Sequence, residues 1–258
     1  MEKNPMKSRV IFFQSAAGER IAGTFHEPAR PGNAGVVLGH CFTCSRHTSI
    51  LKDLADAVTE RGIMALRFDF SGNGQSTGDF RQTTYTRHRD EMRRAVAELT
   101  SMGIDRIGLA GHSMGASIAL MTATVLPETA AVCALAGRLD GGSAADLFSR
   151  EQQIRARRAG EIEFISRGRR LRLGKDFFED AIHHDPRRIL RDMSAPLLVV
   201  HGEADEIIPV SAAYGAVRLC PDAELMILPG VDHMFLDKER RKSAAEHIAA
   251  WFQRKLGM

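Results

Sequence analysis

The chain has 258 residues, of which 44% are hydrophobic and 26% charged, as is ordinary for a globular protein with a buried core. A net charge of +3 is too small to indicate nucleic acid as a partner, and no apolar run is long enough to span a membrane. The first eight residues lack the apolar stretch of a secretory signal, and four cysteines do not make a disulfide framework in a chain of this size. We therefore expect a cytoplasmic protein.

Strands and helices alternate along most of the chain. Two β-rich runs, 8–13 and 20–25, flank Ala17-Gly18 and predict an antiparallel hairpin at a sheet edge. The expected buried strands span 34–38, 63–68, 104–110, 130–136, 195–201 and 224–228. The expected helices span 49–61, 86–102, 116–126 and 241–256. This alternation predicts an α/β fold in which helices cover both faces of a mostly parallel sheet.

The alternation breaks between residues 138 and 190, a stretch rich in arginine. We interpret it as an insertion of mostly helical character that lies over the carboxyl ends of the strands, where open α/β sheets bind ligands. It divides the core of a single catalytic domain into residues 1–137 and 191–258. Its arginines either steer an anionic substrate or form a solvated face, and Asp140, Phe148 and Phe164 are candidates for lining a pocket.

The pentapeptide Gly111-His-Ser-Met-Gly115 has the pattern G-x-S-x-G and lies between a predicted strand and a predicted helix. In that context the pattern indicates a sharp turn that presents a nucleophilic serine. The glycines allow the backbone to turn tightly without a side chain in the way. Ser113 is therefore the candidate nucleophile.

A serine hydroxyl needs a base to take its proton, and the base needs a partner that orients it. Asp205 follows the strand 195–201 and is the candidate acid, with Glu203 and Asp232 as competitors. His233 follows the last predicted strand and is the candidate base. Loops after three strands would then converge on Ser113.

These motifs resemble those of the α/β-hydrolases over essentially the whole chain. The residues that carry the resemblance are Gly111-His-Ser-Met-Gly115, His201-Gly-Glu-Ala-Asp205, Gly230-Val-Asp-His233, and Asp69 with Gly72-Asn-Gly-Gln-Ser76. The resemblance implies the α/β-hydrolase fold, with an eight-stranded sheet and a helical lid insertion. It also implies an oxyanion hole formed by the backbone N–H groups of Phe42 and Met114.

Within that family, Gly39-His-Cys-Phe-Thr-Cys44 resembles the oxyanion loop of hydrolases fused to an OsmC-like domain and that of bacterial feruloyl and cinnamoyl esterases. The chain departs from many relatives in having Cys41 where they have glycine, and it contains no OsmC-like domain. The resemblance therefore implies esterase chemistry and no redox function from a fusion partner.

Cys41 and Cys44 form a C-x-x-C pair close to His40 and His47. Such a pair is typical of a redox centre or a metal site, but here we favour two small side chains packed beside the oxyanion loop. A regulatory role for their oxidation remains a hypothesis. The glycines of 72–78 do not have the spacing of a dinucleotide-binding loop, so we interpret that stretch as a turn.

The sequence thus predicts a serine hydrolase that cleaves small-molecule carboxylic esters of small to medium acyl or aryl acids. The predicted mechanism requires no metal and no organic cofactor. The alternatives are a thioesterase, an acylglycerol lipase, a peptidase or an acyltransferase with the same triad, or a non-catalytic ligand-binding or redox-responsive module. The oligomeric state is left open, a homodimer included.

Overall fold

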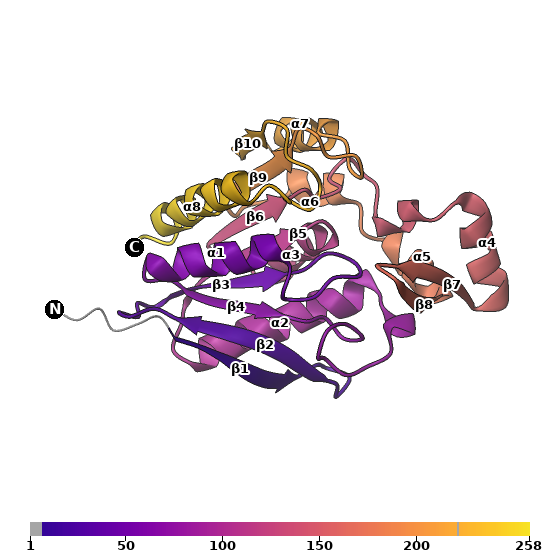
Figure 1. The fold of residues 1–258 in the computed structure, drawn as a ribbon, viewed down its shortest axis with the longest axis horizontal. Coiled ribbons are helices and arrows are strands. Elements are labelled where there is room, and N and C mark those ends of the chain that lie inside the picture. Colours follow the sequence, from indigo (N-terminus) through magenta and orange to yellow (C-terminus); the bar gives the residue numbers. More distant parts are fainter. Residues whose placement is uncertain (1–6, 221) are drawn as a thin grey trace.

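The computed structural model describes residues 7–220 and 222–258, and its centre is an eight-stranded sheet (Figure 1). The strands lie in the order β1-β2-β4-β3-β5-β6-β9-β10. Their bounds are β1 Lys7–Gln14, β2 Arg20–Glu27, β3 Ala34–Gly39, β4 Met64–Phe68, β5 Arg106–His112, β6 Ala131–Leu135, β9 Leu197–Gly202 and β10 Glu224–Leu228. β2 pairs antiparallel with β1 and β4, and all other neighbours in this sheet are parallel. The predicted sheet is confirmed.

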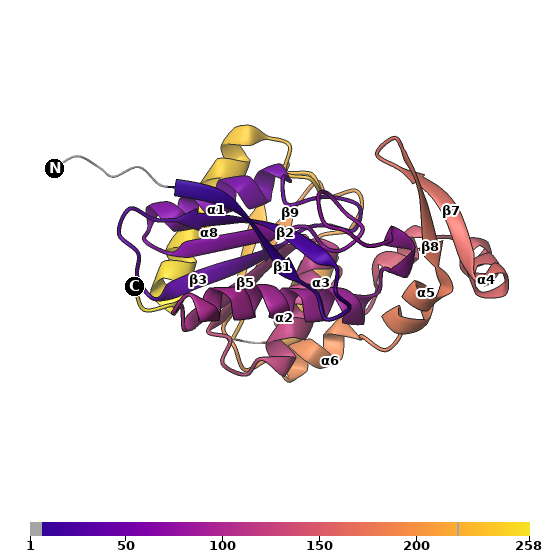
Figure 2. The same ribbon diagram turned by 90° about the horizontal axis from the view of Figure 1, so that it is seen from below.

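Helices cover both faces of the sheet, as Figure 2 shows edge-on. α1 (Ser49–Glu60) and α8 (Lys238–Lys255) pack together on one face. α2 (Tyr85–Ser101), α3 (Met114–Val125) and α7 (Ser211–Leu219) contribute to the core on the other face. α3 is buried on nearly all sides, which explains why its sequence is apolar all round rather than amphipathic.

The four predicted helices are confirmed, and α7 is an addition. α7 has only nine residues and contains Gly215 in its interior, so its helical pattern is short and interrupted by a poor helix former. No helix within residues 7–220 and 222–258 has the length and apolar character needed to cross a lipid bilayer.

The insertion between β6 and β9 has more helical than strand residues, as predicted, but it also contains a β-hairpin that the prediction did not include. It contains the 3-10 helix η2 (Ala144–Leu147), α4 (Arg150–Ala159), an antiparallel hairpin of β7 (Glu161–Ser166) and β8 (Arg169–Gly174), α5 (Lys175–Ala181) and α6 (Pro186–Arg191). Side chains alternate along both strands, with Ile162 and Leu173 buried. The many arginines on the outer face hid this alternation of period two.

Figure 2 shows α4, α5, β7 and β8 standing apart from the layered core, whereas α6 lies close to it. α6 packs against α3 and α7. The last part of the 138–190 segment therefore packs against helices of the core. The division of the domain at residues 138 and 190 stays a prediction.

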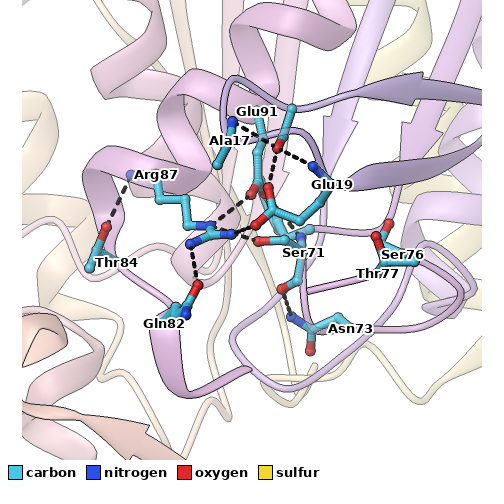
Figure 3. Close-up of polar contacts among 12 residues, drawn as sticks. Ala17, Glu19, Ser71, Asn73, Ser76, Thr77, Gln82, Thr84, Arg87 and Glu91 are labelled. Atoms are coloured by element: carbon cyan, nitrogen blue, oxygen red, sulfur yellow. Dashed lines mark hydrogen bonds and ion pairs between the residues drawn. The ribbon is translucent and has the colours of Figure 1, made fainter. Parts of the chain in front are cut away.

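A buried polar network supports the turn after β4 (Figure 3). The guanidinium of Arg87 pairs with Glu19 and donates from Nε to Ser71 Oγ at 3.1 Å. Glu91, one turn further along α2, accepts a hydrogen bond from the backbone N–H of Ser71 at 3.0 Å. Its other carboxylate oxygen lies 3.5 Å from Arg87 Nε. Glu91 is only 1% exposed, and burial raises the pKa of its carboxyl to about 7.

We expect Glu91 to make the protein less stable as the pH rises. Its folded-state pKa of about 7 lies above the ordinary value of 4.5, so its stabilising contribution is complete below pH 4.5 and is lost as the pH rises through 7. The loss amounts to about 3 kcal/mol at most. Glu91→Gln lacks this effect. The free energy of unfolding of Glu91→Gln minus that of wild type should therefore be greater at pH 8 than at pH 5, by a comparable amount.

Urea unfolding of both proteins at pH 5 and pH 8 measures this difference. Buried histidines titrate in both proteins alike, so they cancel in the comparison. Glu98→Gln, at a partly exposed position of the same helix, is the control and should show no such pH dependence. A difference between wild type and Glu91→Gln that stays constant with pH would contradict the expectation.

Candidate active site

Ser113 lies on the sharp turn between β5 and α3, as predicted. Its backbone has a φ of 57° and a ψ of −117°, which a residue with a side chain adopts only under strain. A Cβ atom on Gly111 would overlap the backbone of Gly115, and one on Gly115 would overlap the backbone of Gly39. Only glycine fits these two positions, because the turn brings β3, β5 and α3 into close contact.

A chain of hydrogen bonds links the three residues predicted as a triad. His233 Nε2 lies 3.1 Å from Ser113 Oγ. On the other side of the ring, His233 Nδ1 lies 2.7 Å from Asp205 Oδ2. Ser113 follows β5, Asp205 follows β9 and His233 follows β10, so three loops at the same edge of the sheet bring them together. The geometry matches that of a nucleophile, a base and an orienting acid.

Asp205 has the carboxylate best placed to orient His233. Its Oδ1 accepts the backbone N–H groups of Ile207 at 2.9 Å and Ile208 at 2.8 Å. Burial by itself would raise the pKa of this carboxyl. Hydrogen bonds from His201, His233 and Ile208 outweigh that effect and hold the pKa of Asp205 well below its usual range. Asp205 is therefore a fixed negative charge beside the imidazole.

The two competitors predicted for the acid have other contacts. Glu203 accepts the backbone N–H of Gly230 at 3.3 Å, and Asp232 accepts the backbone N–H of Leu236 at 3.1 Å. Both hydrogen bonds lie in exposed surroundings. Neither carboxylate is hydrogen-bonded to His233 within the part of the chain that the structure describes.

Two further histidines fix the backbone around the triad. His112 is fully buried, and its Nε2 lies 2.8 Å from the carbonyl oxygen of His233. Burial lowers the pKa of His112 to about 3, and the nearby His233 contributes to the same shift. The ring is therefore neutral and donates this hydrogen bond. His201 Nε2 lies 2.9 Å from the carbonyl oxygen of Ile208. Both rings position backbone that carries His233 or Asp205.

Phe42 and Met114, the predicted oxyanion residues, both lie beside Ser113. Phe42 is in the loop after β3, and Met114 is the first residue of α3. Together with Ser113 they line a recess of about 30 Å³. Met114 lies in the first turn of a helix, where backbone N–H groups have no partner within the helix. The recess adjoins Ser113, and its use as an oxyanion hole stays a prediction.

His40 holds the loop that carries Phe42. Its Nε2 accepts the backbone N–H of Phe70 at 3.0 Å, so the proton is on Nδ1, which donates to the carbonyl oxygen of Cys41 at 2.7 Å. Burial lowers the pKa of His40 to about 4, which keeps the ring neutral. Like His112, His40 therefore bonds only to the backbone in the part of the chain that the structure describes.

Cys41 and Cys44 form a disulfide, which corrects the favoured prediction of two unlinked side chains. Their Cα atoms are 5.2 Å apart, and the bond encloses Phe42 and Thr43. The sequence pattern C-x-x-C contained this signal, but the spacing alone does not distinguish linked from unlinked cysteines. Cys133 and Cys220 are free and buried.

Arg46 is a residue of this region that sequence reasoning missed. Its guanidinium is 2% exposed and pairs with Asp69, which is fully buried. Asp69 also accepts the backbone N–H groups of Arg46 at 2.6 Å and Gln75 at 2.9 Å. The pair therefore joins the loop after β3 to the glycine turn after β4. Only the folded structure shows it, because a lone arginine in a loop gives no signal in sequence.

A cavity of about 670 Å³ opens beside Ser113 and His233. Its walls are largely apolar and come from the oxyanion loop, the insertion and the loops after β9 and β10. Phe148 and Phe164 line it as predicted, whereas Asp140 does not belong to its lining. The Phe42 ring stacks on those of Phe164 and Phe177, with centroids 6.0 and 5.1 Å apart. The insertion therefore packs on the side chain of Phe42, a predicted oxyanion residue.

The described residues hold no group of three or more histidine, cysteine, aspartate or glutamate side chains arranged for a metal ion. The site comprises a serine hydroxyl hydrogen-bonded to an oriented imidazole, a small neighbouring recess and an adjoining apolar cavity.

Comparison with known proteins agrees with this geometry. Residues 36–246 match the model of the alpha/beta hydrolase family. The chain is similar to the monoacylglycerol lipase of Mycolicibacterium smegmatis, at 24% identity over 93% of this chain and 95% of that protein. It is also similar to the solved esterase domain of a Rhodothermus marinus protein, at 25% identity and a TM-score of 0.76, covering 98% of this chain and all of that one.

The structure of Est1E from Butyrivibrio proteoclasticus with bound ferulic acid shares the fold at 18% identity. Its TM-score is 0.83, and the match covers 96% of this chain and all of that one. The family model spans most of the sheet and all three strand ends that carry Ser113, Asp205 and His233. The chain therefore belongs to the alpha/beta hydrolase family.

Proposed function

We propose that this protein is a serine hydrolase that cleaves carboxylic esters of small to medium acyl or aryl acids. The observation that supports it most is the hydrogen-bonded chain from Ser113 Oγ through His233 to Asp205. Relatives described as a lipase and an esterase favour the same class of reaction. The substrate is a small molecule, because the cavity beside Ser113 has a volume of about 670 Å³.

In the proposed mechanism, His233 Nε2 takes the proton of Ser113 as Oγ attacks the ester carbonyl carbon. Asp205 accepts a hydrogen bond from Nδ1–H, stays ionised and stabilises the imidazolium that forms. The N–H groups of Phe42 and Met114 donate to the oxyanion. His233 then gives its proton to the departing alcohol, which leaves an acyl group on Ser113. Water, deprotonated by His233, releases the acid and restores the serine.

Hydrolysis of p-nitrophenyl acetate, butanoate and octanoate tests the proposed reaction. We expect turnover of at least one of them, and the preferred chain length measures how much of the cavity an acyl group fills. If none of the three is hydrolysed faster than in buffer alone, ester hydrolysis is contradicted. The cytoplasmic location, the homodimer and the narrower likeness to OsmC-fused hydrolases stay predictions.

Reduction of the Cys41–Cys44 disulfide is expected to affect stability more than catalysis. A cross-link over so short a loop contributes about 2 kcal/mol to the free energy of unfolding. The loop is also held by His40, by the Cys44 N–H bond to the Cys41 carbonyl at 3.1 Å, and by Arg169 donating to the Thr43 carbonyl at 2.9 Å. We therefore expect dithiothreitol to change kcat/KM for p-nitrophenyl butanoate by less than about threefold.

Urea unfolding and ester hydrolysis with and without dithiothreitol measure both effects. The double variant Cys41→Ser/Cys44→Ser is the control and should not respond to the reductant. A loss of activity greater than about tenfold in wild type alone would show that the disulfide itself holds the oxyanion loop. That result would support the hypothesis of redox regulation.

A further inference from the structure

Arg167 lies at the tip of the β7–β8 hairpin and lines the cavity that contains Ser113 and His233. Its φ is 51° and that of Gly168 is 72°, so both residues of the two-residue turn are left-handed. This turn type suits the twist of a hairpin, but it favours asparagine, aspartate or glycine at the first position. Arginine there has a conformational cost, and residues held in this way are concentrated at functional sites.

The hairpin tip is fastened to the oxyanion loop on both sides of Arg167. Thr43 Oγ1 and Ser166 Oγ lie 2.7 Å apart, and Arg169 donates to the Thr43 carbonyl at 2.9 Å. Arg167 Nη2 lies 3.2 Å from the sulfur of Met234, the residue after His233. The guanidinium is therefore held across the mouth of the cavity between the oxyanion loop and the loop of the base.

Two other arginines of the hairpin and one of α6 have acidic partners, whereas Arg169 of the hairpin donates to the Thr43 carbonyl. Arg170 pairs with Glu163, Arg172 with Glu161 and Arg187 with Asp185. Within residues 7–220 and 222–258, Arg167 makes no ion pair. The lining of the cavity contains no aspartate or glutamate. Arg167 thus contributes a positive charge without an acidic partner to a cavity whose other described lining residues include no lysine, arginine, aspartate or glutamate.

We propose that Arg167 is a specificity-determining residue that binds a carboxylate on the ester substrate, so that negatively charged esters are the preferred class. The proposal rests on the ester hydrolysis proposed above. Arginine presents two parallel donors that match a carboxylate. Phe148 and Phe164 line the same cavity and provide apolar surface for the rest of the substrate. The carboxylate belongs either to the acid or to the alcohol part of the ester.

Two matched pairs of substrates distinguish these sources. Methyl 4-carboxycinnamate and methyl 4-carbamoylcinnamate differ only by a carboxylate or a neutral amide on the acid part. The butanoate esters of 4-hydroxybenzoate and 4-hydroxybenzamide place the same difference on the alcohol part. We expect wild type to prefer the charged member of at least one pair by about fivefold or more in kcat/KM, as an ion pair at a partly solvated mouth provides.

Variants assign the preference to Arg167. Arg167→Gln should reduce the ratio of charged to neutral substrate to about one, and Arg167→Lys should retain part of it. Arg170→Gln, on the same hairpin but paired with Glu163, is the matched control and should leave the ratio unchanged. A ratio compares two substrates on one protein sample, so a variant that folds less well does not alter it. Sodium chloride should lower the ratio in wild type.

Two results would overturn the proposal. If wild type shows no preference for the charged member of either pair, Arg167 is only a solvated side chain at the hairpin tip. If the preference exists but persists in Arg167→Gln, another residue is responsible. Failure of the proposed reaction would be a different observation, since wild type would then hydrolyse neither the charged nor the neutral esters.

Discussion

Ser113→Ala is expected to lower kcat/KM for p-nitrophenyl butanoate by about four orders of magnitude or more. The variant retains the recess beside Phe42 and Met114 and the cavity, so it can still bind the ester. It lacks the Oγ atom that lies 3.1 Å from His233 Nε2, so no acyl-enzyme forms. Residual activity would come only from water attack on a bound and polarised ester.

Ser117→Ala is the matched control for this change. Ser117 is buried one helical turn beyond Ser113, in α3, and lines the same recess. Its substitution removes a hydroxyl from the same helix without touching the bond to His233. We expect it to lose less than about tenfold in kcat/KM. Equal activity of wild type and Ser113→Ala would exclude Ser113 as the nucleophile.

Asp205→Asn is expected to lower kcat by about four orders of magnitude while the protein stays folded. The asparagine oxygen can still accept the N–H groups of Ile207 and Ile208. Its amide then presents N–H to His233 Nδ1, which favours the tautomer with the proton on Nε2. In that tautomer His233 cannot accept the proton of Ser113, although the distances are nearly unchanged.

Glu203→Gln is the control for the acid, because Glu203 is the competitor in the same loop. It accepts the N–H of Gly230 in an exposed position, so we expect less than about threefold loss. Steady-state kinetics of the three proteins, with thermal unfolding to verify folding, measure the effect. A large loss in Glu203→Gln and a small one in Asp205→Asn would transfer the role of the acid to Glu203.

The strands and the mostly parallel character of the sheet could be predicted because their signals are local. Six buried apolar runs, each separated from the next by a helix or a turn, require parallel pairing with crossover connections. The position of Ser113 followed from the glycines on either side of it, whose close contacts the structure shows directly. Asp205 and His233 were found because side chains that follow parallel strands meet at one edge of the sheet.

The parts that the sequence did not reveal depend on contacts between distant segments. Arg46 and Asp69 are 23 positions apart, and nothing in either segment indicates that they form a buried pair. The β7–β8 hairpin was missed because Arg169, Arg170 and Arg172 masked an alternation that only Leu171 and Leu173 carry on that strand. Gly168 was the one local hint of a turn, and Arg-Gly is not a residue pair typical of a two-residue hairpin turn.

Labelling with a fluorophosphonate probe, followed by mass spectrometry of the intact protein and its peptides, tests the central claim most directly. The probe phosphonylates a serine only when a base activates its hydroxyl, and it needs no knowledge of the natural substrate. We predict one adduct per chain, on the peptide that contains Ser113, with none in Ser113→Ala and much slower labelling in Asp205→Asn. An unlabelled wild type, or an adduct on another serine that persists in Ser113→Ala, would contradict the assignment of Ser113 as an activated nucleophile.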